Sequence, residues 1–130
     1  MSKAIRMALA CAAAFPAHAD VQPACRSCQR GCEMVMRHGG PDLDLAAVLD
    51  LNMRFWKPQS SHGIEILGWS AERLGDGRCA VSYTYREAQE VSIRWDVDLV
   101  AGSITAQGPL AERMQRMSEV LSTTTKGSQP

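Results

Sequence analysis

The chain lacks any apolar stretch that is long enough to cross a membrane as a permanent helix, which takes about 20 residues. The uninterrupted apolar run from Met7 to Phe15 has nine residues, and no later segment approaches transmembrane length. An excess of charge of one sign is also missing, since 14 basic side chains balance 14 acidic ones. Without a basic stripe, nucleic acid is not expected as a partner.

Motifs of the common enzyme classes are missing as well. The sequence contains no G-x-S-x-G elbow, no phosphate-binding loop and no H-E-x-x-H zinc motif. Histidine is scarce, with three in the chain, and the H-G-G run at 38–40 has no nucleophile motif to accompany it. We therefore predict that the protein is not an enzyme, and we assign no catalytic residue.

The N-terminus does contain the pattern of a secretory signal peptide. Lys3 and Arg6 precede the apolar run, and Ala17-His18-Ala19 after it is a small-x-small cleavage site. The L-A-C run at 9–11 also resembles a lipid-attachment site, although the apolar run before it is short for one. We expect residues 1–19 to be removed, which leaves a single small, weakly acidic domain without an integral membrane segment. Its expected location is periplasmic or secreted, after a bacterial-type export signal.

Export to an oxidising compartment allows the cysteines to form disulfides, and four of them follow the cleavage site. An even number in a small exported domain predicts two disulfides. If residues 24–38 form a helix, Cys25, Cys28 and Cys32 lie on one face, with Cys28 and Cys32 closer in register than Cys25 and Cys32. Our preferred pattern joins Cys25 or Cys28 to the neighbouring cysteine of the helix, and joins the remaining thiol to Cys79.

The same segment has an alternative interpretation as a metal site. Its ligands would be the side chains of the pattern C-x2-C-x3-C-x5-H, namely Cys25, Cys28, Cys32 and His38. Zinc prefers thiolate and imidazole, and the methionines at 34 and 36 add thioethers that suit copper(I). A reducing compartment would be needed to keep the thiols free. As a redox pair, C-R-S-C lacks the preceding strand of a thioredoxin-type unit. Structural disulfides without a cofactor are preferred, with zinc or copper binding as the alternative.

Two further helices are predicted outside the cysteine segment. Apolar residues at steps of three and four predict a helix over residues 43–56, opened by Pro41-Asp42 and ended by Lys57-Pro58. Its apolar stripe is Leu45, Val48, Leu49, Asn52, Phe55 and Trp56. A last helix is expected over residues 109–121. Residues 122–130 have no apolar periodicity and are predicted to be a disordered tail.

Between residues 64 and 106 the apolar period changes to two, which predicts an antiparallel meander of three or four strands. Gly75-Asp76-Gly77 is a hairpin turn signal. The side chains expected to face the helices are Val81, Tyr83, Val91, Ile93, Trp95 and Val97, and Cys79 shares their face. Those expected on the open face are Ser82, Thr84, Ser92, Arg94, Asp96 and Asp98. Helices followed by a meander and a final helix predict an α+β fold.

The run A-V-S-Y-T-Y-R-E-A-Q-E-V-S-I-R-W-D-V-D-L-V-A-G-S-I-T-A resembles the second half of a PepSY-type domain. Those small exported modules typically carry a strand that ends in V-D and a short glycine-containing turn into a final strand. Val97-Asp98 and Gly102-Ser103-Ile104 occupy these places. The resemblance covers about Leu43 to Ala106 and leaves out the cysteine segment and the last helix. It implies a non-catalytic role, in which the domain binds or inhibits an exported or cell-envelope protein.

A sheet with one polar face offers a flat surface for such a partner. Our hypothesis places the partner on Ser92, Arg94, Asp96 and Asp98, where one cation lies beside two carboxylates. Simple solvation of that face is the alternative. The sequence thus predicts an exported, disulfide-stabilised α+β domain whose function is to bind another protein.

Overall fold

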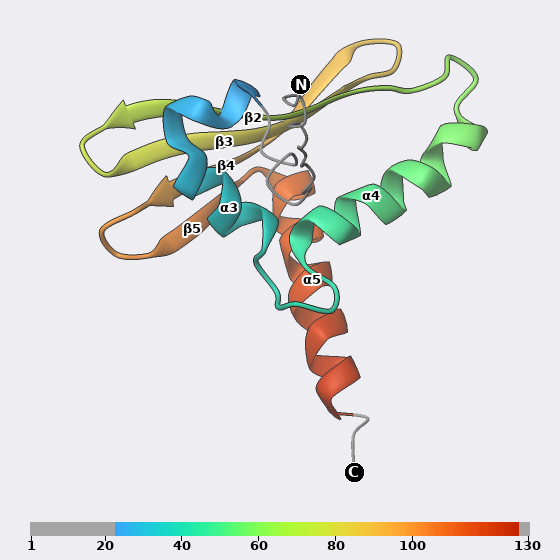
Figure 1. The fold of residues 1–130 in the computed structure, drawn as a ribbon. Helices are drawn as coiled ribbons and strands as arrows, with labels where there is room; N and C mark the ends of the chain where they lie inside the picture. The colour runs from blue at the N-terminus through green and yellow to red at the C-terminus, as the bar shows by residue number, and fades with distance from the viewer. Residues whose placement is uncertain (1–22, 128–130) are drawn as a thin grey trace, which may run out of the picture.

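The computed structural model describes residues 23–127, and these form a four-stranded antiparallel sheet with helices on one of its faces (Figure 1). The predicted signal peptide lies outside the described residues. The elements are η2 Pro23–Cys28, α3 Gln29–Met36, α4 Leu45–Trp56, η3 Lys57–Gln59, β2 Glu65–Gly75, β3 Arg78–Arg86, β4 Glu90–Asp98, β5 Ser103–Gln107 and α5 Pro109–Gly127. The α+β fold class and the meander are confirmed.

The sheet has the order β2-β3-β4-β5, so each strand pairs with its neighbour in sequence. Asp76 and Gly77 form the turn of the first hairpin, as predicted. The predicted inward-facing side chains of β3 and β4 are all buried, apart from Val91, which is half-buried. Trp69 of β2 joins them, with its ring centroid 5.2 Å from Tyr83 and 6.0 Å from Trp95. The core therefore lies between this face and the helices.

Helix α4 begins two residues later than predicted, because its cap is Asp44 and not Pro41-Asp42. Asp44 has an extended backbone, and its carboxylate accepts a hydrogen bond of 2.9 Å from the amide of Ala47. An aspartate at this position satisfies one of the free amides of the first turn. Phe55 is a second difference, since its side chain is 65% exposed while that of Met53 is buried.

The cysteine segment is not one continuous helix, contrary to the prediction for residues 24–38. It is divided into η2 and α3 at Cys28, whose backbone angles of φ −154° and ψ 66° are not helical. On a straight α-helix, positions seven apart are separated by about 10.5 Å. The Cα atoms of Cys25 and Cys32 are only 6.2 Å apart. The break at Cys28 thus brings together two cysteines that a regular helix would keep apart.

The four cysteines form the disulfides Cys25–Cys32 and Cys28–Cys79. Two disulfides were predicted, with one bond inside the segment and one to Cys79, and this is confirmed. The bond inside the segment joins the first cysteine to the third and leaves out Cys28 between them. The expectation that neighbouring cysteines pair there is therefore wrong. Gly31 lies against the second bond, because a Cβ at this position would be 2.8 Å from the Sγ of Cys28. A glycine is therefore needed where α3 approaches β3.

Helix α5 packs on β4 and β5 and also contacts α4. It continues to Gly127, so the prediction of a disordered tail is wrong for residues 122–127, while residues 128–130 lie outside the described part of the chain. The loop before α4 rests on this helix. Gly39 has a φ of +103°, and a Cβ there would lie 2.8 Å from the Cβ of the buried Ser118.

We expect Gly39→Ala to lower the free energy of unfolding by about 2–3 kcal/mol, because it adds a contact with Ser118 to the strain of a positive φ. The matched control is Gly63→Ala, since Gly63 has a φ of +76° but no atom within 4 Å of the added Cβ. That variant should lose about 1 kcal/mol, the cost of the backbone conformation alone. Urea unfolding curves measure both, and equal losses would contradict the close packing of Gly39.

Candidate functional site: the polar face of the sheet

The face of the sheet that turns away from the helices is lined by polar and small side chains, and we call it the polar face. It consists of the outward side chains of four strands: Glu65, Ser70, Glu72, Arg78, Ala80, Ser82, Thr84, Arg86, Glu90, Ser92, Arg94, Asp96, Asp98, Ser103, Thr105 and Gln107. These side chains are exposed or half-buried, except that Ala80 is buried among its neighbours. The predicted division between the inward and outward sides of β3 and β4 is confirmed.

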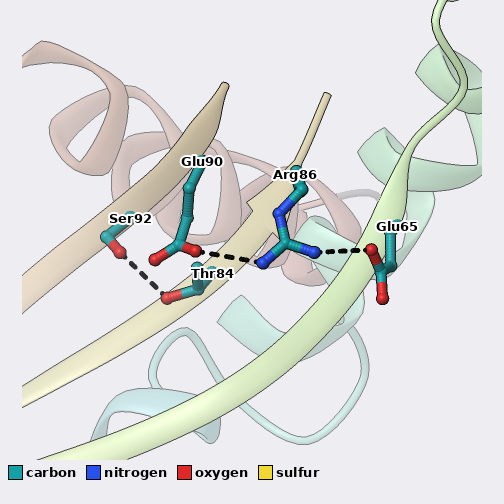
Figure 2. A network of polar contacts seen from close by, with 5 residues as sticks. All are labelled: Glu65, Thr84, Arg86, Glu90 and Ser92. Carbon is teal, nitrogen blue, oxygen red and sulfur yellow. Dashed lines mark hydrogen bonds and ion pairs between the residues drawn. The ribbon is translucent and has the colours of Figure 1, made fainter. Parts of the chain in front are cut away.

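One end of the polar face carries a charged row that crosses three strands (Figure 2). Arg86 of β3 lies between Glu65 of β2 and Glu90 of β4, because all three are paired in register. Its Nη1 donates to Glu65 at 2.8 Å, and its Nη2 lies 3.4 Å from an oxygen of Glu90. In the next row the hydroxyls of Thr84 and Ser92 share a hydrogen bond of 2.9 Å. Sequence reasoning had not included Glu65, Arg86 or Glu90 in the site.

The centre of the polar face is organised around Asp96. The Nε of Arg94 donates to one of its carboxylate oxygens at 2.9 Å, and the side-chain amide of Gln107 donates to the other at 3.3 Å. The side chain of Arg94 is 45% exposed and that of Asp96 is 25% exposed. The two oxygens of Asp96 are thus already hydrogen-bonded, whereas much of the Arg94 guanidinium faces solvent. The charge offered at this point is therefore mainly positive.

Asp98, the fourth residue predicted for the partner surface, has a structural role. Its Oδ1 accepts hydrogen bonds from the backbone amides of Val100 and Ala101, at 3.0 and 2.9 Å. Such bonds hold the turn between β4 and β5. A shallow depression of about 210 Å³ lies beside it, lined by Arg78, Asp96, Ser103 and Thr105. Ser92, Arg94 and Asp96 remain as the predicted residues whose polar groups point to the open surface.

The residues of the alternative metal site are engaged in other bonds. Cys25, Cys28 and Cys32 are in disulfides, and a disulfide sulfur is not the thiolate that zinc or copper(I) takes as a ligand. The Nε2 of His38 lies 2.7 Å from a carboxylate oxygen of Glu119 on α5. Within residues 23–127 no three histidine, cysteine, aspartate or glutamate side chains are grouped so that they hold a metal ion. The structure does not bring His38 together with the cysteines as a ligand set.

The contact between His38 and Glu119 has an electrostatic consequence. The hydrogen bond from His38 is the main cause that lowers the pKa of Glu119 from its ordinary value of 4.5, and Gln115 and Arg116 act in the same direction. Partial burial of Glu119 opposes them. A carboxylate whose pKa is lowered by folding stabilises the fold above the pKa of the unfolded chain, and this contribution is lost as the pH falls through the folded value.

We therefore expect Glu119→Gln to be less stable than the natural chain at pH 6, and the difference to shrink as the pH falls below 4.5. The control is Glu72→Gln on the exposed side of β2, which removes a carboxylate but leaves the contact between His38 and Glu119 in place. Urea unfolding between pH 3 and 7 measures the difference. A gap between Glu119→Gln and the natural chain that stays constant or widens toward acid pH would contradict the assignment.

None of the helices among the described residues is both long and apolar enough to span a membrane. No protein-family model, no curated protein and no solved structure matches this chain.

Proposed function

We propose that this protein is an exported, disulfide-stabilised domain that binds, and thereby inhibits or positions, a cell-envelope or secreted protein. The polar face carries the proposal. The α-helices that contact strands pack against the other side of the sheet, and η2 lies along the edge strand β2. Within residues 23–127 the polar face is therefore uncovered, and its charged and hydroxyl groups are already fixed by hydrogen bonds. A surface whose side chains are ordered before binding loses less conformational entropy when a partner associates.

Two further observations support this proposal. The Cys28–Cys79 disulfide ties the N-terminal segment to β3, as expected of a small domain in an oxidising compartment. The middle of the polar face carries Ser70, Ala80 and Ser82, whose side chains are short. A partner surface can therefore approach the backbone of β2 and β3 closely, with Arg94 beside it as the exposed cation. Arginine is enriched at the centres of protein interfaces.

Site-specific photo-crosslinking in the native host tests whether this face is the contact surface. A benzoylphenylalanine at Ser92 should capture a partner that the same group at the exposed Leu51 of α4 does not capture. The captured protein is then purified, and its affinity is measured. Equal capture from both positions, or capture from Leu51 alone, would contradict the assignment of the polar face.

Arg94→Ala combined with Asp96→Ala should weaken binding of that partner by about tenfold or more. Because the two side chains form an ion pair at the surface, the free energy of unfolding should change by about 1 kcal/mol or less. The matched control removes the exposed ion pair of α4, in which Arg54 and Asp50 are 3.0 Å apart. Calorimetric titration compares the two double variants, and equal affinities would place the partner elsewhere.

A further inference from the structure

The two edges of the sheet are treated differently. At β2, the 3-10 helix η2 packs along the strand, and the hydroxyl of Ser27 donates a hydrogen bond of 2.7 Å to the carbonyl of Ala71. At the other edge, β5 pairs with β4 on one side, and no residue between 23 and 127 forms a hydrogen bond to its other side. Figure 1 shows β5 as the last strand of the sheet. One edge is thus covered and the other is open.

The open edge lacks the features that normally prevent another strand from pairing there. Such edges are usually protected by lysine, proline or a β-bulge. The sequence of β5, S-I-T-A-Q, contains neither residue, and its register with β4 is regular. The backbone groups on the free side of β5 are therefore available to an added strand, which would lie about 4.8 Å away.

A groove of about 320 Å³ runs between this edge and α5, lined by residues 104–106 of β5 and by Glu112, Gln115, Arg116 and Glu119 of α5. Gln115 and Arg116 lie three and four residues after Glu112 and four and three residues before Glu119, so the four form one stripe that faces the groove. Alternate side chains of an added strand would point toward this stripe, and the others would extend the polar face.

The chemistry of the stripe favours basic side chains. The stripe holds two carboxylates, Glu112 and Glu119, and one cation, Arg116. Glu119 already accepts hydrogen bonds from His38 and Gln115, so the exposed Glu112 is the carboxylate that would attract a basic side chain. The side-chain oxygen of Gln115 is buried and has no hydrogen-bond partner among the described residues, while its amide nitrogen donates to Glu119. The half-buried Ile104 and Ala106 form an apolar floor along which the aliphatic part of a long basic side chain can lie. A second copy of the chain fits less well, because β5 carries no charged residue that it would bring to the stripe.

We propose that the groove between β5 and α5 binds an extended segment of a partner protein, which adds to the sheet as a fifth strand and directs arginine or lysine side chains toward α5. Backbone hydrogen bonds to β5 supply the affinity, and the acceptors on α5 select the basic residues, as in other cases of strand addition. This groove lies on another surface than the centre of the polar face. Either proposal can therefore fail while the other holds.

The test uses the disulfide-bonded protein, labelled with ¹⁵N, and a seven-residue peptide with blocked ends that alternates threonine and arginine. Binding should shift the amide resonances of Ser103–Gln107 and slow their hydrogen exchange. A matched peptide that alternates threonine and glutamate should bind at least about threefold more weakly. Absence of shifts at about 1 mM arginine peptide, or shifts confined to other elements, would overturn the proposal.

Two N-methylated peptides separate strand pairing from simple charge attraction. One carries the methyl groups on the arginine amides and the other on the threonine amides. Since alternate amides of a strand point to opposite sides, only one of the two peptides should lose affinity, by about tenfold or more. An equal loss in both, or in neither, would overturn strand addition.

Two variants of the protein locate the charge recognition. Glu112→Lys should weaken binding of the arginine peptide about threefold to tenfold, whereas Glu72→Lys at the far edge of the sheet should leave it unchanged. Unfolding curves confirm that both variants are folded. Equal affinities would overturn the role of α5. Sedimentation of the protein alone tests whether a second copy of the chain binds at β5. Concentration-dependent dimers with altered β5 resonances would show that a second copy occupies this edge.

Discussion

Replacing both Cys28 and Cys79 with alanine should lower the free energy of unfolding by about 4 kcal/mol. This bond joins residues 51 apart in sequence, so its removal gives the unfolded chain a large gain in conformational entropy. The matched variant replaces Cys25 and Cys32, which are seven residues apart, and the same relation predicts a loss of about 2.5 kcal/mol. All four cysteines are buried, so the loss of sulfur packing is similar in the two variants.

Urea unfolding without reductant, followed by far-ultraviolet circular dichroism, measures both double variants. The variant without Cys28–Cys79 is expected to lose more stability than the variant without Cys25–Cys32. If the variant without Cys25–Cys32 were the less stable one, loop length would not be the main source of stabilisation, and local order in η2 and α3 would have to account for it. If both losses were below about 1 kcal/mol, the disulfides would not constrain the unfolded chain as their separations imply.

The strands were predictable from the sequence because one-sided burial imposes a period of two. In β4, Ile93, Trp95 and Val97 are buried while Ser92 and Arg94 are exposed, and the register with β3 preserves this division across the hairpin. A slip by one residue would place the apolar side chains in water. The same pattern therefore determined both the strand and the surface on which the predicted site residues lie.

The charged row at the end of the polar face was not predictable in the same way. The contact between Arg86 and Glu90 can be predicted from the sequence, because the two residues flank one hairpin turn. Its contact with Glu65 depends on the pairing of β2 with β3, where the register shifts between Ile66 and Gly68. The apolar period of the sequence does not indicate such an irregularity, because a bulge adds a residue to one strand without changing the apolar pattern of the other.

The disulfide pairing depended on a local departure from helical geometry. On a regular helix the spacing of the cysteines made Cys28 and Cys32 the closer pair. The structure interrupts the helix at Cys28, so that Cys25 reaches Cys32 while the side chain of Cys28 reaches Cys79 on β3. Gly31 permits this approach because it has no Cβ. The presence of two disulfides followed from composition, and their pairing followed from the tertiary contact.

Helix α4 was predicted, but the predicted set of buried residues on it was partly wrong. Leu45, Leu49, Met53 and Trp56 follow one another at steps of three or four, and all of them are buried or half-buried. Phe55 lies one turn after Leu51, and both are exposed. Steps of three and four through Asn52 placed Phe55 in the predicted stripe, whereas the helix buries Met53 and leaves Phe55 on the solvent side. Spacing alone therefore allowed two stripes, and the packing of the helix on the core selected one of them.

Trp95→Ala should lower the free energy of unfolding by about 3–5 kcal/mol, the usual cost of removing a large buried aromatic side chain. Trp95 is fully buried at the centre of the sheet, opposite Val81 of β3 and Ala106 of β5. It also contacts Trp69, whose ring centroid is 6.0 Å away. The control is Phe55→Ala on α4, which should change stability by under about 0.5 kcal/mol because Phe55 is exposed. Thermal and urea unfolding measure both.

A second substitution at the same position separates packing from hydrogen bonding. The indole Nε1 of Trp95 is buried and has no hydrogen-bond partner among the described residues. Trp95→Phe keeps an aromatic ring and removes this unsatisfied donor, whose burial is itself unfavourable. We therefore expect Trp95→Phe to cost only about 1 kcal/mol, since the gain from removing the donor offsets part of the cavity. A loss close to that of Trp95→Ala would contradict this expectation. It would mean that the indole Nε1 forms a hydrogen bond in the folded protein, for example to a bound water.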